Sequence, residues 1–186
     1  GYPIRNISVL YHSIMLDRRH ALGLLAAPLA CATTAPRPPD RSYTPAQVAF
    51  RRLGYGLFIH IGPNTIAGVP SGDGRFPAAE VDFPSLDCRQ WARVAVAAGM
   101  KYAVLTAKHH DGFCLWPTAH SAYAVTSTPS RRDIVGEFVT AFREAGIAVG
   151  LYYSLWDRNA AMYEDDDAYA AYMQAQIGEL LTGYGP

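Results

Sequence analysis

Three short apolar segments, about 45 residues apart, constrain the fold more than any other feature of the sequence. They read GLFIH (56–60), YAVLT (102–106) and VGLYYS (149–154). Turn-forming residues bound each segment, and continuous apolar runs of this length are typical of strands buried on both faces of a parallel sheet. The sequence therefore predicts three parallel strands.

Helical patterns separate the three segments. Asp87 is placed to cap the helix CRQWARVAVAAG, and Asp133 is placed to cap IVGEFVTAFREAG. Thr44 followed by Pro45 predicts another helix start, and a last helix is expected over 167–182. The apolar faces expected for the two Asp-capped helices are Trp91, Val94, Ala95 and Ala98 in the first and Ile134, Phe138, Ala141 and Phe142 in the second.

The connections differ at the two ends of the strands. Helices lead almost directly into the next strand, whereas long segments follow each strand, which is the wiring of an α/β fold. Ligand sites of parallel α/β folds form at the carboxyl ends of the strands. His60, His109, His110, Tyr152 and Ser154 all lie there, so these positions are the candidate site.

Three strands do not close a barrel, and a (β/α)8 domain usually needs about 250 residues. The chain ends in ELLTGYGP (179–186), where a loop into a fourth strand is expected. Residues 45–186 are therefore interpreted as the first three βα units of a truncated (β/α)8 TIM-barrel catalytic domain. The alternative is a complete three-layer α/β domain with a small sheet.

The N-terminal region is predicted to be separate from this domain. Residues 15–32 contain paired arginines, a short apolar run and a small-residue cleavage site, which is typical of an export signal peptide on the twin-arginine route. The alternatives are a buried helix or, less favoured because of Pro28, a lipoprotein anchor at Cys31. Residues 33–44 are predicted to be a proline-rich linker, and 1–14 are left unassigned as upstream read-through.

Charge and cysteine content exclude several classes of protein. The formal net charge is zero with no basic stripe, which argues against a nucleic-acid partner. The apolar run near the N-terminus is too short to span a bilayer. Cys31, Cys88 and Cys114 have no zinc-type spacing. A disulfide between Cys88 and Cys114 would need Cα atoms within about 7 Å, and the sequence leaves that pairing open.

Five segments carry a resemblance to a known family. They are GLFIHIGPNT (56–65), LTAKHHDGFCLWPT (105–118), RRDIVGEF (131–138), GLYYSLWDRN (150–159) and ELLTGYGP (179–186). In this order and spacing they resemble the N-terminal half of the catalytic barrel of α-L-fucosidases, glycoside hydrolase family 29. The branch resembled is the one that prefers α-1,3- and α-1,4-linked fucose.

The resemblance implies a retaining glycoside hydrolase that acts on fucosylated oligosaccharides without a cofactor or metal. Carried over by position, His60, His109, His110 and Tyr152 match residues that contact fucose. The two catalytic carboxyl groups of the family are expected beyond Pro186, so no catalytic residue is assigned in this chain and the fragment alone is expected to be inactive. The oligomeric state is left open.

A departure from the family pattern and the spacing of the histidines bear on two alternatives. Pro70 and Ser71 stand where the family has a sugar-binding Glu followed by an aromatic residue, which leaves a non-hydrolytic fucose-binding relative as an alternative. A metal-dependent barrel hydrolase is less favoured, because the histidines lack a metal-type spacing. Among other residues, Asp111 is expected in a turn, Trp116 either in the core or at the pocket rim, and Asp157 in an ion pair with Arg158.

Overall fold

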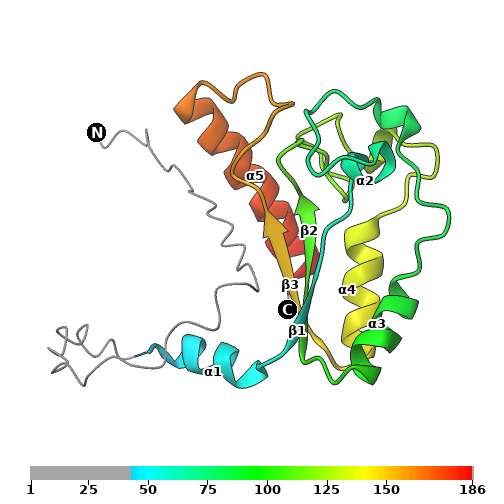
Figure 1. Ribbon diagram of the computed structural model, residues 1–186. Helices are drawn as coiled ribbons and strands as arrows, with labels where there is room; N and C mark the ends of the chain where they lie inside the picture. The colour runs from blue at the N-terminus through cyan, green and yellow to red at the C-terminus, as the bar shows by residue number, and fades with distance from the viewer. Residues whose placement is uncertain (1–42, 186) are drawn as a thin grey trace, which may run out of the picture. The chain divides into compact units, whose positions relative to one another are not determined.

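The computed structural model describes residues 43–185 (Figure 1). The predicted signal peptide, the unassigned residues 1–14 and the linker prediction up to residue 42 lie outside this range. The described elements are α1 (Pro45–Leu53), β1 (Gly56–Ile59), α2 (Pro63–Ala67), the 3-10 turn η2 (Ala78–Glu80), α3 (Cys88–Ala97), β2 (Tyr102–Lys108), the 3-10 turn η3 (Val125–Ser127), α4 (Ile134–Glu144), β3 (Ala148–Tyr153) and α5 (Asp166–Tyr184).

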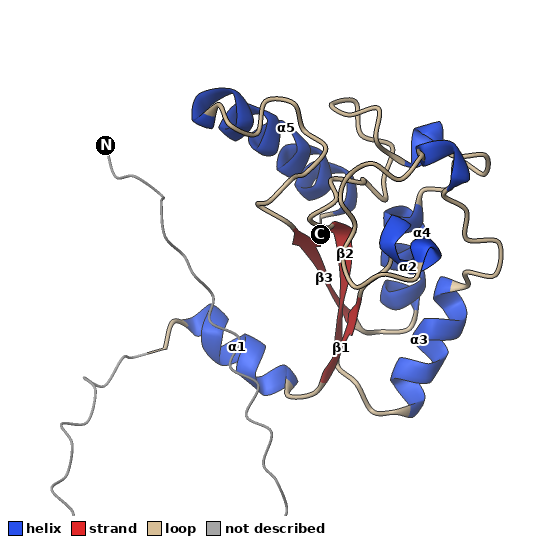
Figure 2. Ribbon diagram, turned by 45° about the horizontal axis from the view of Figure 1, so that its top comes forward, coloured by secondary structure: helices blue, strands red, loops and turns tan. Residues whose placement is uncertain are grey.

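The three strands form one parallel sheet, as the continuous apolar segments predict, and their order is β1-β2-β3. Tyr102 of β2 lies opposite Gly56 of β1 and Ala148 of β3. The α/β class is therefore confirmed. Figure 2 shows the strands side by side, with the loops that follow them gathered at one end of the sheet.

Polar side chains begin the helices where the sequence predicts. Asp87 accepts a hydrogen bond from the Gln90 amide at 3.0 Å and starts α3, and Asp133 accepts one from the Gly136 amide at 2.9 Å and starts α4. Such caps satisfy amide groups that have no partner within the helix. Thr44 likewise caps α1, and Asp165 caps α5.

The core lies between the sheet and the helices. In β2, Ala103, Leu105 and Ala107 are completely buried, and α4 contributes its predicted face, with Ile134, Phe138, Ala141 and Phe142 all buried. Leu180 of α5 belongs to the same core. α3 lies beside α4 in both views (Figures 1 and 2). The sheet and these helices therefore share one hydrophobic core.

The expected buried face of α3 is partly wrong. The residues that α3 buries are Cys88, Ala92 and Ala95, whereas Val94 is 53% exposed. Trp91 packs against the core from its edge. Ala98, which follows α3, is also exposed, and α3 packs against α4. Among the helices of residues 43–185, none is both long enough and apolar enough to cross a membrane.

The two ends of the sheet are built differently. Short turns lead into β2 and β3, and their backbone continues the ladder: the Lys101 amide bonds the Tyr55 carbonyl at 2.9 Å, and the Ala148 amide bonds the Lys101 carbonyl at 3.1 Å. At the opposite end, long segments leave each strand before the next of the helices α3, α4 and α5 begins. The candidate site residues lie at this second end.

Candidate functional site at the carboxyl ends of the strands

A shift in register at the end of β2 determines where the histidine pair points. Thr106 lies opposite Tyr152, but Lys108 lies opposite Tyr153, so two steps along β2 match one step along β3. Side chains alternate along a regular strand, and an extra residue reverses that alternation. Lys108 therefore turns toward the Tyr153 side of the sheet, and His109 turns toward the Tyr152 side.

His109 meets two of the other predicted site residues there. Its ring centroid lies 5.3 Å from the ring centroid of His60 and 6.2 Å from that of Tyr152. The rings of His60 and Tyr152 are 6.1 Å apart. Phe58 lies under this group, with its ring 4.3 Å from His60 and 5.8 Å from Tyr152. The ends of all three strands thus contribute to one aromatic cluster.

His110 lies beside His109, with ring centroids 4.2 Å apart, and it has a separate polar partner. Its Nδ1 lies 2.7 Å from Oγ of Ser154, the first residue after β3. Ser154 is completely buried. Both histidines of the pair therefore join the same site, one through ring contacts and the other through a hydrogen bond across to the next strand.

Trp156 and Arg158 extend the site beyond the histidines. The Trp156 ring lies 5.2 Å from the His110 ring, and the Arg158 guanidinium carbon lies 4.0 Å from the Trp156 ring centroid. Arg158 also donates to the Gly72 carbonyl at 2.9 Å, which ties the loop after β3 to the loop after β1. Trp156 remains 42% exposed, so the arrangement presents an indole face beside the histidines.

Burial and neighbouring charge keep the histidine pair neutral. Burial lowers the pKa of His109 to about 4, and the charges of His110, His60 and Arg158 act in the same direction. Burial also lowers the pKa of His110, with Arg158 and His60 adding to the effect. A neutral imidazole has one donor and one acceptor nitrogen, as a sugar hydroxyl also donates and accepts. The pair is chemically suited to hydroxyl groups.

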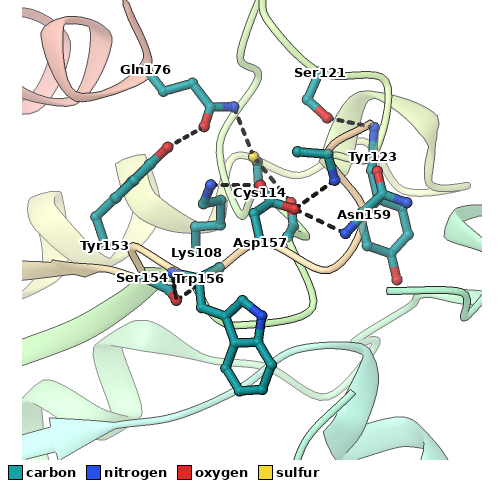
Figure 3. Close-up of polar contacts among 12 residues, drawn as sticks. Lys108, Cys114, Ser121, Tyr123, Tyr153, Ser154, Trp156, Asp157, Asn159 and Gln176 are labelled. Carbon is teal, nitrogen blue, oxygen red and sulfur yellow. Dashed lines mark hydrogen bonds and ion pairs between the residues drawn. The ribbon is translucent and has the colours of Figure 1, made fainter. Parts of the chain in front are cut away.

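A buried ion pair connects the two loops that carry the site residues. Nζ of Lys108 lies 2.7 Å from Oδ2 of Asp157, and Oδ1 of Asp157 accepts from the amides of Asn159 and Ala160. Figure 3 shows this pair beside Tyr153, Cys114 and Gln176, with the Trp156 ring pointing away from it. Lys108 precedes the histidine pair and Asp157 follows Trp156, so one ion pair connects both loops of the site.

This ion pair corrects a prediction and reveals a missed residue. The predicted Asp157–Arg158 pair is wrong, because Asp157 bonds Lys108 and Arg158 stacks on Trp156. The sequence analysis assigns Lys108 no role, although a lysine at the end of a buried strand indicates a charged partner, since a buried ammonium needs one.

Two other residues follow from the same loops. Asp111 accepts from the Phe113 amide at 2.9 Å, which confirms the predicted turn, and burial raises the pKa of its carboxyl group. Trp116 is buried and donates from Nε1 to Glu179 at 2.9 Å, so it belongs to the core and not to the pocket rim. Cys88 and Cys114 are both buried and are not bonded to one another.

Within residues 43–185, no group of three or more His, Cys, Asp or Glu side chains is arranged to hold a metal ion. His60, His109 and His110 meet through their ring faces and edges instead.

Comparison with known proteins shows the family to which this chain belongs. A family model described as alpha-L-fucosidase matches residues 79–186. An alpha-L-fucosidase 1 relative from Oryza sativa subsp. japonica is 43% identical over 179 residues, which cover 92% of this chain and 35% of the relative. The fold is thus the α/β fold of glycoside hydrolase catalytic domains.

Solved structures agree with the family model. A glycoside hydrolase 29 member from an unknown rumen bacterium is 42% identical with a TM-score of 0.74, covering 76% of this chain and 26% of that one. A Bacteroides thetaiotaomicron alpha-L-fucosidase, trapped as a covalent intermediate, is 31% identical with a TM-score of 0.67, covering 77% and 40%. The chain belongs to the alpha-L-fucosidase family, glycoside hydrolase family 29. It spans about a third of the length of the rice relative.

Proposed function

We propose that this chain is part of a retaining α-L-fucosidase that hydrolyses terminal α-linked L-fucose from oligosaccharides or glycoconjugates. The observation that carries the proposal is the cluster of His60, His109 and Tyr152 rings at the strand ends of a chain of this family. The covalent intermediate trapped in the Bacteroides relative supports a retaining mechanism, since retention proceeds through such an intermediate.

In this proposal, residues 45–186 supply the first three βα units of a (β/α)8 barrel and the fucose-contacting side chains His60, His109, His110 and Tyr152. A retaining mechanism needs two carboxyl groups about 5–5.5 Å apart, one as nucleophile and one as acid/base. We expect both from sequence positions after Pro186. No residue of this chain is therefore given a catalytic role.

The test uses the full-length protein that contains this chain and the substrate 4-nitrophenyl α-L-fucoside. We expect release of nitrophenol, and ¹H NMR recorded during the first turnovers is expected to show α-L-fucose before it equilibrates with the β form. A first product in the β form would contradict retention. Absence of hydrolysis in a folded protein would contradict the activity itself.

The linkage preference is tested separately. We propose the branch of the family that acts on α-1,3- and α-1,4-linked fucose. Release of fucose from a trisaccharide branched in either linkage, with at least about tenfold lower kcat/KM on α-1,2-linked 2′-fucosyllactose, is the expected outcome. Equal rates on all three linkages would place the protein outside that branch.

The site is tested by substitution of His60, which contributes its ring from the end of β1. His60→Ala is expected to lower kcat/KM about five- to tenfold, because a lost hydrogen bond to substrate costs about 1–1.5 kcal/mol. The matched control is His120→Ala. His120 lies on a different loop and pairs with Glu179 at 3.5 Å, so we expect unchanged kinetics. An equal loss of kcat/KM in both variants would contradict the assignment of His60 to the site.

A non-hydrolytic fucose-binding protein is the second candidate, and the segment around Pro70 and Ser71 favours it. Within the described residues 43–185, Ser71 Oγ has one long contact, to the neighbouring Gly72 carbonyl at 3.5 Å, and Glu80, the nearby carboxylate, lies in η2 with its side chain exposed. Calorimetry with L-fucose separates the two candidates. Binding without any hydrolysis would favour the second.

We also propose that residues 15–32 direct export, on the basis of their paired arginines and small-residue cleavage site. Expression in a bacterium with a working twin-arginine system, followed by N-terminal sequencing of the periplasmic product, tests this. A mature chain beginning near Thr33 is the expected result. Retention of the segment in the cytoplasm would contradict export, and a diacylglyceryl thioether on Cys31 would indicate the lipoprotein alternative.

A further inference from the structure

Ser154 connects three groups at the site through one hydroxyl. It is completely buried at the end of β3. Its Oγ lies 2.7 Å from the Trp156 carbonyl oxygen, 3.1 Å from the Trp156 amide nitrogen and 2.7 Å from Nδ1 of His110. A serine hydroxyl has one hydrogen to donate and two lone pairs to accept with, so these three partners use its full capacity.

The direction of each hydrogen bond follows from the chemistry of the partners. A carbonyl oxygen only accepts, so the Ser154 hydroxyl hydrogen points at the Trp156 carbonyl. The Trp156 amide only donates, so it takes one lone pair of Oγ. The other lone pair faces Nδ1 of His110, and that nitrogen must then carry a hydrogen. A neutral ring that is protonated at Nδ1 has a free lone pair at Nε2.

His109, the neighbour of His110, has no such arrangement. Its Nδ1 is buried, and among the described residues it has no hydrogen-bond partner. The hydrogen bond that the His110 ring makes within residues 43–185 is through Nδ1, to Ser154. The loop after β3 thus makes a hydrogen bond to the ring of His110 but, among the described residues, not to Nδ1 of His109.

We propose that Ser154 is a positioning residue that holds neutral His110 in the Nδ1–H form, so that Nε2 accepts a hydrogen bond from a hydroxyl group of the sugar. This inference rests on the proposed function for the identity of the sugar. The sugar hydroxyl that faces Nε2 must act as a donor, which leaves its own lone pairs for another group. Burial, which lowers the pKa of His110, keeps the ring in the neutral form that this role needs.

The first measurement reads the tautomer directly. The full-length protein is labelled with ¹⁵N-histidine, and long-range ¹H–¹⁵N spectra are recorded near neutral pH, with a His110→Gln variant to assign the signals. The expected spectrum has a protonated Nδ1 and an unprotonated Nε2 for His110. An unprotonated Nδ1 overturns the inference, whether or not any variant folds.

The second measurement uses variants of Ser154 with L-fucose as the probe. Ser154→Ala is expected to shift His110 toward the Nε2–H form and to weaken fucose binding about fivefold or more, as expected for one lost hydrogen bond. Ser154→Thr keeps the hydroxyl and is expected to restore both. The control is Ser127→Ala, which removes a hydroxyl that bonds the Ala122 carbonyl at 2.7 Å away from the site. It is expected to change neither.

A series of monodeoxy L-fucoses identifies the hydroxyl and separates this inference from the proposed function. The Ser154→Ala loss is expected to vanish for the single analogue that lacks the hydroxyl facing Nε2. An equal loss for every analogue overturns the proposed contact. If the wild-type protein shows the Nδ1–H form but binds no fucose, the proposed function fails together with the sugar part of the inference. If it binds fucose through a ring in the Nε2–H form, the inference alone fails.

Discussion

Lys108 and Asp157 form an ion pair 2.7 Å long in which neither side chain has more than 1% of its surface exposed. Nζ also lies 4.3 Å from the centroid of the Tyr153 ring, which adds a cation–π contact. The pair joins the end of β2 to the loop after β3 (Figure 3). Two segments that are nearly 50 residues apart in sequence, each carrying site residues, are thereby held together.

Removal of the lysine is predicted to be strongly destabilising. Lys108→Met leaves the Asp157 carboxylate buried without its countercharge, which typically costs about 3–5 kcal/mol of unfolding free energy. Chemical denaturation of the full-length protein measures this. The exposed Arg89–Glu144 pair, 3.6 Å apart, is the control, and Arg89→Ala is expected to cost less than about 1 kcal/mol. Equal costs at the two pairs would contradict the role assigned to burial.

The titration of His109 is predicted to be displaced to low pH. Because burial, with the charges of His110, His60 and Arg158, lowers its pKa from 6.5 to about 4, the ring is neutral above pH 5. The unfolded chain binds the proton at higher pH than the folded chain, so the contribution of His109 to stability is present above pH 6.5 and is lost as the pH falls toward 4. Histidine NMR against pH checks the pKa, and a midpoint near 6.5 would contradict the prediction.

Gly112 is predicted to tolerate no side chain. It has φ of +86°, and a Cβ there would lie 2.9 Å from Cγ of Asp157 and 3.0 Å from Cβ of Asn159. Gly112→Ala should therefore cost both backbone strain and a displacement of the loop after β3. Gly99→Ala is the matched control, with φ of +73° and no atom within 4 Å of the added carbon. It should cost only the strain of about 1–2 kcal/mol. The larger unfolding penalty is expected at Gly112, and the reverse order would contradict this account.

Both described cysteines are predicted to be unreactive in the folded protein. Burial raises the pKa of the Cys88 and Cys114 thiols to about 12, and only the thiolate reacts with alkylating reagents. Treatment with iodoacetamide at pH 8, followed by mass spectrometry of the peptides, should find both unlabelled before denaturation and labelled after it. Rapid labelling of Cys114 in the native protein would show that the loop around it opens.

The sequence was sufficient for the elements that depend on local chemistry. The three strands follow from continuous apolar runs. The starts of α3 and α4 follow from Asp87 and Asp133, because aspartate side chains favour hydrogen bonds to nearby backbone amides and therefore cap helices. It was also sufficient to locate His60, His109 and Tyr152 at one end of the sheet, because parallel wiring brings all strand ends together.

The features that depend on contacts between distant segments were not predictable in the same way. The register shift between Thr106 and Lys108 arises from pairing with β3, and no residue within β2 predicts it. The partner of Asp157 lies on another strand, so the nearer Arg158 was the natural but wrong expectation. Trp116 has a partner on α5, Glu179, more than 60 residues away, and this contact places the indole in the core.

The two ends of the sheet separate the candidate site from the turns that lead into the strands. The short turns before β2 and β3 continue the ladder through Tyr55, Lys101 and Ala148, and they leave little freedom for insertion. The long segments that follow the strands carry His110, Trp156 and most of the polar contacts between loops. Substitutions and insertions in those segments can alter the candidate site while the sheet and the hydrophobic core beside it stay unchanged, so the site and the stability of the fold can be altered separately.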